Sequence, residues 1–203
     1  MGIVSRGFAG KHFRRPRPEL AGRVPPGQYL AEGFPVLTAG ATQHVRTERW
    51  SFTVRGGAGE PTWTWTDLLS LPAEQITVDI HCVTHWSKLD TTWTGVSLDR
   101  LLTGADRAAG YALAVSYGGY ATNLPVEEIV DDKAWLVYAY EGAPIPPEHG
   151  GPVRMLVPAH YLWKSAKWIH ELWLMDEDRP GFWERSGYHN FGDPWREQRY
   201  YDD

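Results

Sequence analysis

Cysteine is almost absent from this sequence: its 203 residues contain a single one, Cys82. One cysteine cannot form a disulfide within the chain, which fits a reducing compartment. It also leaves no set of four cysteine ligands for an iron–sulfur cluster. Any thiolate chemistry of this chain must therefore use Cys82.

Long apolar runs and an excess of basic charge are missing as well. No stretch approaches the ~20 apolar residues that span a bilayer, and the opening residues lack the apolar region of a signal peptide. Arg14-Arg15 could begin a twin-arginine signal, but Pro16 to Glu19 follow where an apolar run is needed. The net charge of −5 gives no basic field for nucleic acid. We therefore expect a cytoplasmic protein without a membrane span that does not bind nucleic acid.

The remaining composition is that of an ordinary globular protein. Hydrophobic residues make up 42% and charged residues 22%, so the chain should fold, and its length favours one domain. Residues 1–30 hold six Lys or Arg against one acid and several prolines, which predicts an extended arm before a domain over 31–203. The 11 tryptophans could wall a deep cofactor site or could simply pack a core.

Alternation of apolar and polar residues predicts a β-rich core with short helices, an α+β fold. Ile76, Val78 and Ile80 share one face of a strand, and Cys82 is in phase with them, so it should point inward from the strand end. Helix starts are expected at Thr66, Ser97 and Pro125. Long structured loops are expected over 141–151 and 178–203. The expected strands are 50–54, 75–82, 111–117, 134–141, 153–157 and 167–175.

Cys82 opens a His-Cys-Val-Thr-His-Trp-Ser turn, where a thiolate can face a cavity. A lone cysteine is usually an inert buried residue. Thiolates are nevertheless good ligands for soft metals, which makes Cys82 a candidate metal ligand. The pair Cys82 and His85, with His149 or His160 from elsewhere, leaves a zinc-dependent hydrolase as an alternative.

Two further segments have groups that could bind a phosphate. Residues 149–154, His-Gly-Gly-Pro-Val-Arg, place a fixed cation at a turn that backbone can approach closely. Residues 163–168, Trp-Lys-Ser-Ala-Lys-Trp, add a hydroxyl and two ammonium groups. Arginine, lysine, serine and backbone amides together form a typical phosphate cradle, although either segment alone could be a solvated surface turn.

Three blocks of sequence resemble the molybdopterin-binding domain of the sulfite oxidase family, over most of the chain from about Gln28 onward. The first is 81–87 with the Trp-Thr-Gly-Val of 93–96, similar to a cysteine loop followed by a Trp-x-Gly turn and a short helix. The second is the Gly-Tyr-Ala-Thr-Asn-Leu-Pro of 119–125. The third runs from Ala-Tyr-Glu at 139–141 through 149–154 to 165–168. Residues 179–189 also resemble small bacterial members of the family.

The resemblance implies a mixed α and β fold and a molybdenum cofactor with a single pterin, whose metal Cys82 would ligate. It also implies that this chain binds the pterin and its phosphate. The matched cofactor-binding positions are Thr122, His149, Arg154, Ser165, Ala166 and Lys167. Residues 34–37 would lie near the pterin too.

The expected activity is oxygen-atom transfer, with two electrons, on a small sulfur-containing or other oxo substrate. Tyr140 matches an active-site tyrosine, and we expect Tyr140 and His85 to hydrogen bond the substrate. No arginine soon follows Cys82 as it does in sulfite oxidases, which argues against sulfite. A non-catalytic cofactor carrier is the alternative. The chain has no recognisable haem site, so we expect a separate electron-transfer partner.

Overall fold

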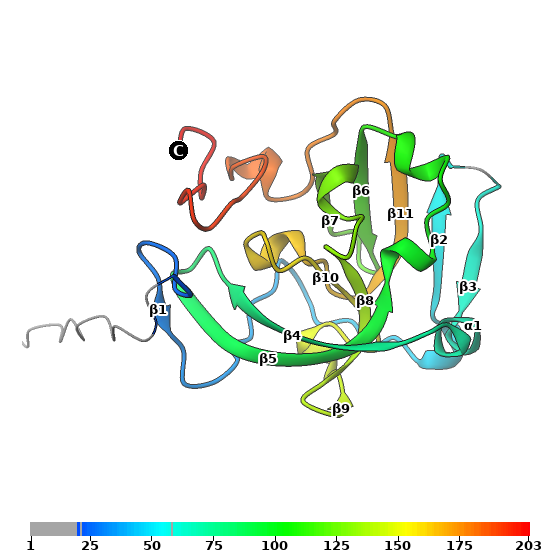
Figure 1. Ribbon diagram of the computed structural model, residues 1–203, viewed down its shortest axis with the longest axis horizontal. Coiled ribbons are helices and arrows are strands. Elements are labelled where there is room, and N and C mark those ends of the chain that lie inside the picture. Colours follow the sequence, from blue (N-terminus) through cyan, green and yellow to red (C-terminus); the bar gives the residue numbers. More distant parts are fainter. Residues whose placement is uncertain (1–19, 21, 58) are drawn as a thin grey trace, which may run out of the picture.

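Two mixed β-sheets share one core in the computed structural model, which describes residues 20, 22–57 and 59–203 (Figure 1). The first sheet has six strands in the described part of the chain: β1 (Tyr29–Leu30), β4 (Glu74–His81), β5 (Trp86–Ser97), β8 (Trp135–Tyr140), β9 (Ala143–Pro144) and β10 (Arg154–Leu156). The second has five: β2 (Ser51–Arg55), β3 (Thr62–Thr64), β6 (Tyr111–Ser116), β7 (Ala121–Pro125) and β11 (Ile169–Met175). Most of the predicted arm, residues 1–19 and 21, lies outside the described residues.

The sequence predicted six of these strands with both ends within two residues of those observed: β2, β4, β6, β8, β10 and β11. The helices are short, which also agrees with the prediction of an α+β fold with a β-rich core. The α-helix α1 (Trp65–Ser70) is capped by Thr64, whose side chain accepts from the Asp67 N–H. The predicted start at Thr66 was therefore two residues late. The 3-10 helices are η2 (Thr47–Arg49), η3 (Leu98–Arg100), η4 (Asp106–Ala108), η5 (Val126–Glu128), η6 (Pro147–His149), η7 (Leu162–Lys164) and η8 (Glu184–Ser186).

Strand β5 is the main element that the sequence did not predict. The expected Trp-x-Gly turn at 93–96 was wrong, because these residues continue a long strand that pairs with β4 on one side and β8 on the other. Gly95 makes this close pairing possible: a Cβ there would lie 2.3 Å from the Leu136 carbonyl oxygen. In Figure 1, β4 and β5 curve together along the lower edge of the molecule.

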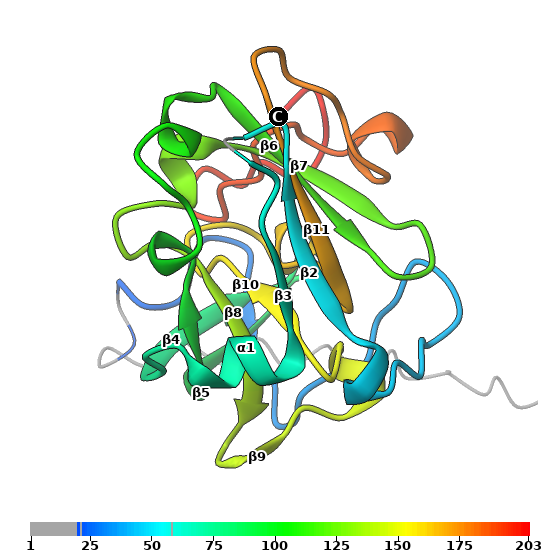
Figure 2. The same ribbon diagram turned by 90° about the vertical axis from the view of Figure 1, so that its right-hand side faces the viewer.

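The main core lies between the two sheets. Phe52 and Leu172 of the second sheet contribute to it, as do Leu136 and Met155 of the first, and all four are at most 1% exposed. In Figure 2, β2, β3 and β11 of the second sheet lie beside β8 and β10 of the first. A smaller apolar cluster surrounds Cys82 at the end of β4. The main core and this smaller cluster thus fix the strand ends on which the candidate residues lie.

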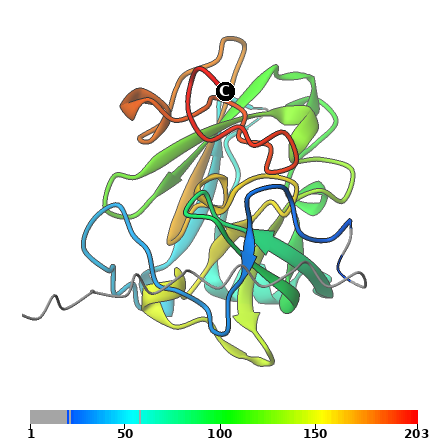
Figure 3. The same cartoon turned by 90° about the vertical axis from the view of Figure 1, so that its left-hand side faces the viewer.

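Segments far apart in the sequence meet beside the turn after β4. The Tyr29 N–H of β1 donates to His85 O at 2.8 Å, and Arg199 donates to Pro26 O at 3.4 Å. Figure 3 shows the C-terminal segment folded over this region. Among the described residues, no helix is long and apolar enough to cross a membrane.

Candidate functional site

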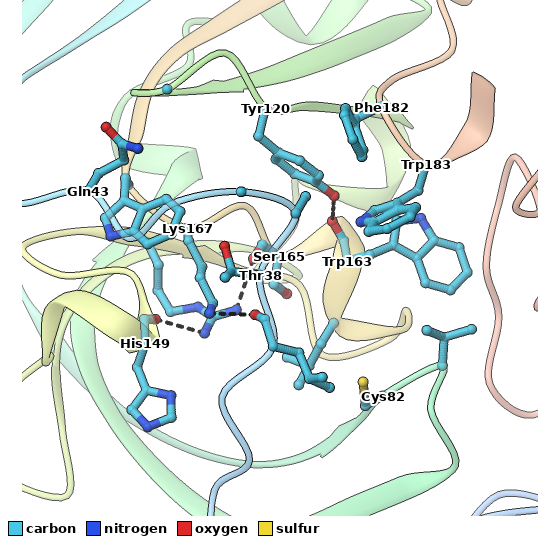
Figure 4. Close-up of a pocket in the computed structure, with 18 of the residues that line it drawn as sticks. Thr38, Gln43, Cys82, Tyr120, His149, Trp163, Ser165, Lys167, Phe182 and Trp183 are labelled. Atoms are coloured by element: carbon cyan, nitrogen blue, oxygen red, sulfur yellow. Dashed lines mark hydrogen bonds between the residues drawn. The ribbon is translucent and has the colours of Figure 1, made fainter. Parts of the chain in front are cut away.

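Cys82 follows β4 in a tight turn that returns the chain into β5. Its N–H donates to Trp86 O at 2.8 Å, and the His85 N–H donates to Cys82 O at 3.1 Å. His85 closes the turn with a left-handed φ of 70°. The Cys82 Sγ lies in a half-open cavity, 3.1 Å from Thr84 Oγ1 (Figure 4). Burial raises the pKa of the Cys82 thiol, and a bound metal would oppose this because metals bind the thiolate.

The cavity has a volume of about 370 Å³ and is lined by segments from all parts of the described chain. This volume lies within the ~300–1,000 Å³ range of small-molecule and cofactor pockets. Most of the lining is apolar or aromatic. Apart from Cys82 and three tyrosines, the ionisable side chains among the lining residues are His149, Arg154 and Lys167. The cavity is therefore rich in cations and has no carboxylate in its lining.

Arg154 begins β10 and is only 2% exposed. Its guanidinium donates to three backbone carbonyl oxygens: His149 O at 3.0 Å, Ser165 O at 2.9 Å and Met155 O at 3.4 Å. Burial lowers the pKa of Arg154 to about 10, so the side chain stays charged at neutral pH. Its contacts join the two segments that the sequence picked out as phosphate-binding candidates.

Lys167 lies on the same side of the cavity and is also held by backbone carbonyl groups. Its Nζ donates to Leu37 O at 2.7 Å and to Glu148 O at 2.6 Å. Burial and the neighbouring Arg154 charge lower the pKa of Lys167 to about 8. Among the described residues, no carboxylate lies within 4.0 Å of the charged nitrogens of Lys167 or Arg154. A buried guanidinium and a half-buried ammonium, with no carboxylate partner in the described part of the chain, favour the binding of an anion.

The turn before β10 packs tightly on Lys167. Gly150 has a φ of 105°, and a Cβ there would lie 2.8 Å from the Lys167 Cβ, so only glycine allows this approach. The His149 ring stacks on Phe34 with centroids 4.0 Å apart. Its Nδ1 is buried and has no partner among the described residues. Burial and the charges of Lys167 and Arg154 lower the pKa of His149, which favours a neutral ring with one nitrogen free for a ligand.

A buried ion pair supports the opposite side of the cavity. Lys164 and Glu184 lie 2.6 Å apart with side chains at most 2% exposed. The Glu184 Oε1 also accepts from Trp163 Nε1 and from Thr122 Oγ1, each at 2.9 Å. Tyr120 donates its hydroxyl to Trp163 O at 2.5 Å. These bonds fix the Trp163 ring, which lines the cavity.

The structure brings five of the predicted site residues to one cavity: Cys82, His149, Arg154, Ser165 and Lys167. Ser165 stabilises this side of the cavity with two hydrogen bonds. Its hydroxyl accepts from the Val157 N–H at 2.9 Å, and its carbonyl oxygen accepts from Arg154.

Four other predicted residues are not among those that line the cavity. Thr122 is fully buried against Glu184, and Ala166 lies in the main core. Tyr140 packs on Trp93 at 4.7 Å between ring centroids. His85 is exposed and its Nδ1 lies 3.0 Å from Gly27 O.

Sequence reasoning missed much of the lining. Thr38 and Gln43 lie in an irregular segment with no motif. The aromatic residues of the lining gave a signal only as members of segments that were quoted for the resemblance or for phosphate binding, and through the high tryptophan content. The lining residues that were not predicted individually include Thr38, Gln43, Tyr120, Trp163, Phe182, Trp183 and Tyr188.

The zinc alternative finds no support in the geometry. In the described part of the chain, no three side chains of His, Cys, Asp or Glu are grouped as ligands for a metal ion. Zinc in proteins usually needs three or four such ligands. Cys82 is thus a single candidate metal ligand, and it lies on a cavity that two cations also line.

Comparison with known proteins identifies the family to which the domain belongs. Residues 39–183 match a family model described as "Oxidoreductase molybdopterin binding domain". The chain is 40% identical over 186 residues to "Uncharacterized oxidoreductase YuiH" of Bacillus subtilis (strain 168), which covers 90% of this chain and 94% of that protein.

Two further matches, one relative and one solved structure of similar fold, are longer than this chain. One is "Putative protein-methionine-sulfoxide reductase subunit YedZ1" of Azospira oryzae, 31% identical over 133 residues, with 64% of this chain and 50% of that protein covered. The other is a solved structure, the sulfane dehydrogenase SoxCD from Paracoccus pantotrophus, with a TM-score of 0.61 at 16% identity. The match covers 91% of this chain and 58% of the SoxCD chain, and it confirms the fold.

Proposed function

This chain belongs to the family of oxidoreductase molybdopterin-binding domains and is a molybdopterin-dependent oxidoreductase, and we propose that it catalyses two-electron oxygen-atom transfer on a small sulfur-containing or other oxo substrate. One observation supports the proposal most strongly. The cavity combines the single thiol of the chain with two cations that have no carboxylate partner among the residues that the structure describes. A soft metal ligand and an anion-binding end are what a metal held by an anionic organic cofactor requires.

The residues present fit such a cofactor. Cys82 would hold the metal through its Sγ. Arg154 and Lys167 would hold the phosphate of the pterin, and the free Nδ1 of His149 would take a polar group of the cofactor. One thiolate and one cationic end support a single pterin. When bound, the cofactor supplies the two-electron chemistry, and the protein supplies its position and surroundings.

The rest of the lining would orient the substrate. Trp163 and its aromatic neighbours form one apolar side of the cavity, which lowers the dielectric around groups bound there. Tyr140 and His85 lie just outside the lining, and we expect them to act by supporting their neighbours: Tyr140 backs Phe34 at 5.3 Å between ring centroids, and His85 holds the cysteine turn. We also propose a separate electron-transfer partner and a cytoplasmic location.

Metal and pterin analysis tests the proposal. The protein should be expressed in a host that makes the molybdenum cofactor and purified without added metal. We expect about one molybdenum and one pterin per chain by mass spectrometry and by pterin fluorescence. Stoichiometric zinc without molybdenum would contradict the proposal and would favour a hydrolase.

A further inference from the structure

The turn that presents Cys82 is held by two segments that are far from it in the sequence (Figure 3). Residues 27–31 lie along the turn and form hydrogen bonds with residues 82–87. Residues 197–199 pack behind the first segment, and Arg199 joins the two segments by donating to Pro26 O. The family model matches residues 39–183 and therefore includes neither segment. Any role of these residues at the site must be argued from their contacts.

Gln28 is the residue of these segments that reaches the cysteine itself. Its Nε2 donates to Cys82 O at 3.1 Å, and in the described part of the chain no other side chain bonds to the Cys82 backbone. The same oxygen accepts from the His85 N–H, and the Cys82 N–H donates to Trp86 O. The peptide groups on both sides of Cys82 are thus fixed. They set the direction of its Cα–Cβ bond and leave the Sγ only rotation about that bond.

The Gln28 side chain is supported in turn by two residues behind it. Burial raises the pKa of Tyr161, and Arg199 and Gln28 beside the phenol oppose this shift. Tyr161 is fully buried, and the Arg199 guanidinium lies 5.4 Å from the centre of its ring. Gly27, with a φ of 69°, permits this packing, because a Cβ there would lie 3.1 Å from the Arg199 Nη2.

The fold itself has little need of the Gln28 amide. Its Oε1 is buried, and neither this oxygen nor the Tyr161 hydroxyl has a hydrogen-bond partner among the residues that the structure describes. A buried polar atom without a partner lowers stability. Cys82 O would keep the His85 N–H if Gln28 lost its donor, so no acceptor would be orphaned. An apolar side chain of the same length would therefore serve packing better, which points to a role of Gln28 at the site.

We propose that Gln28 is a positioning residue, which fixes the orientation of the Cys82 Sγ toward the metal, and that Tyr161 and Arg199 hold Gln28 in place. This inference rests on the proposed function, since Cys82 has a metal to bind only if the cavity holds the cofactor. Groups that orient a metal ligand control the geometry of the metal and its reduction potential. Loss of the Gln28 amide should change the properties of the bound metal and leave the stability of the protein unchanged.

Gln28→Met tests this inference, because methionine keeps the length of the side chain and lacks the donor. The molybdenum-loaded variant should keep its metal content and its midpoint of urea denaturation. After partial reduction with dithionite, its molybdenum(V) EPR signal should have shifted g values and should appear at a shifted potential. In the apoprotein, amide hydrogen exchange of residues 82–86 should be about two- to tenfold faster, the range that the loss of one hydrogen bond gives.

Two further variants show whether the effect comes from this contact. Gln75→Met is the matched control, because Gln75 is exposed on β4, the strand that leads to Cys82, and it should match the wild type. Tyr161→Phe keeps the ring and removes the hydroxyl beside Gln28, so it should shift the EPR signal less and in the same direction. Combined with Gln28→Met, the tyrosine change should add nothing, because it acts through Gln28.

The possible results separate the two proposals. A Gln28→Met enzyme with the EPR signal and potential of the wild type would overturn the inference. A lower urea midpoint with loss of molybdenum would also overturn it, because the role would then be structural. Additive shifts in the double variant would remove Tyr161 from the assignment. Wild-type protein without molybdenum would instead refute the proposed function, while hydrogen exchange of the apoprotein would still test the contact of Gln28 with the turn.

Discussion

Partial burial of the Lys167 ammonium lowers the stability of the folded apoprotein, and a bound anion would offset this cost. Its lowered pKa, about 8 against an ordinary 10.5, means that the folded apoprotein binds fewer protons than the unfolded chain between these two pH values. The free energy of unfolding of the apoprotein should therefore rise with pH across this window. Below the window Lys167 is protonated in both states, and the folded protein bears the full cost of burying the ammonium. The rise should be about 1 kcal/mol, because the ammonium is partly solvated.

Replacement of Lys167 by methionine should abolish this rise and lower the pterin content of the purified protein. Urea denaturation of the apoprotein at about pH 7 and about pH 10 measures the first effect, and pterin fluorescence measures the second. Lys133→Met is the control, because Lys133 is exposed and should leave both unchanged. An equal rise in the Lys167 variant would show that other groups cause it.

At the scale of elements, the pairing of β5 with β8 depends on Gly95. Gly95→Ala should lower the free energy of unfolding by about 2 kcal/mol, because its Cβ would meet the Leu136 carbonyl and nothing flexible can move away. In contrast, Gly104→Ala should change stability by less than about 0.5 kcal/mol, since no atom lies within 4 Å of the added Cβ. Urea denaturation of both variants gives the comparison, and equal stabilities would refute the packing account.

The segment around η8 depends on the ion pair of Glu184 with Lys164. Glu184→Gln keeps the shape of the side chain but leaves the Lys164 ammonium buried without a carboxylate, which should cost about 3 kcal/mol. Glu177→Gln is the control, because Glu177 is exposed and close in the sequence. If thermal and urea denaturation find the two variants equally stable, the pair does not support the cavity in the way described.

Sequence reasoning found strands where apolar and polar residues alternate, as in β4 and β11, because a sheet with one buried face requires this pattern. It failed at β5, where Lys88, Asp90 and Gly95 interrupt the pattern and strand pairing on both sides overrides local propensity. For the site, the resemblance located Cys82 and the cationic end. It included the segments that carry Tyr120, Phe182 and Trp183, but it could not show that these rings line the cavity or exclude Thr122 and Ala166 from the lining, because both depend on contacts between distant segments.

At the scale of the whole molecule, we expect electrons to enter or leave this chain through a separate redox partner. One cysteine cannot supply four ligands to an iron–sulfur cluster, so electrons should pass to a separate protein or small carrier. Purified enzyme should turn over with artificial one-electron donors or acceptors, and its visible spectrum should lack Soret and iron–sulfur bands. A stoichiometric haem or cluster bound to this chain would contradict the prediction.

The account as a whole depends on Cys82 as the ligand of molybdenum, and X-ray absorption at the molybdenum edge tests this most directly. Wild-type enzyme should be compared with Cys82→Ser, which should keep much of its pterin through Arg154 and Lys167 but lose turnover. The extended fine structure of the variant should show one sulfur neighbour fewer around molybdenum than the wild type. An unchanged number of sulfur neighbours, or turnover that persists in the variant, would contradict the assignment of the site.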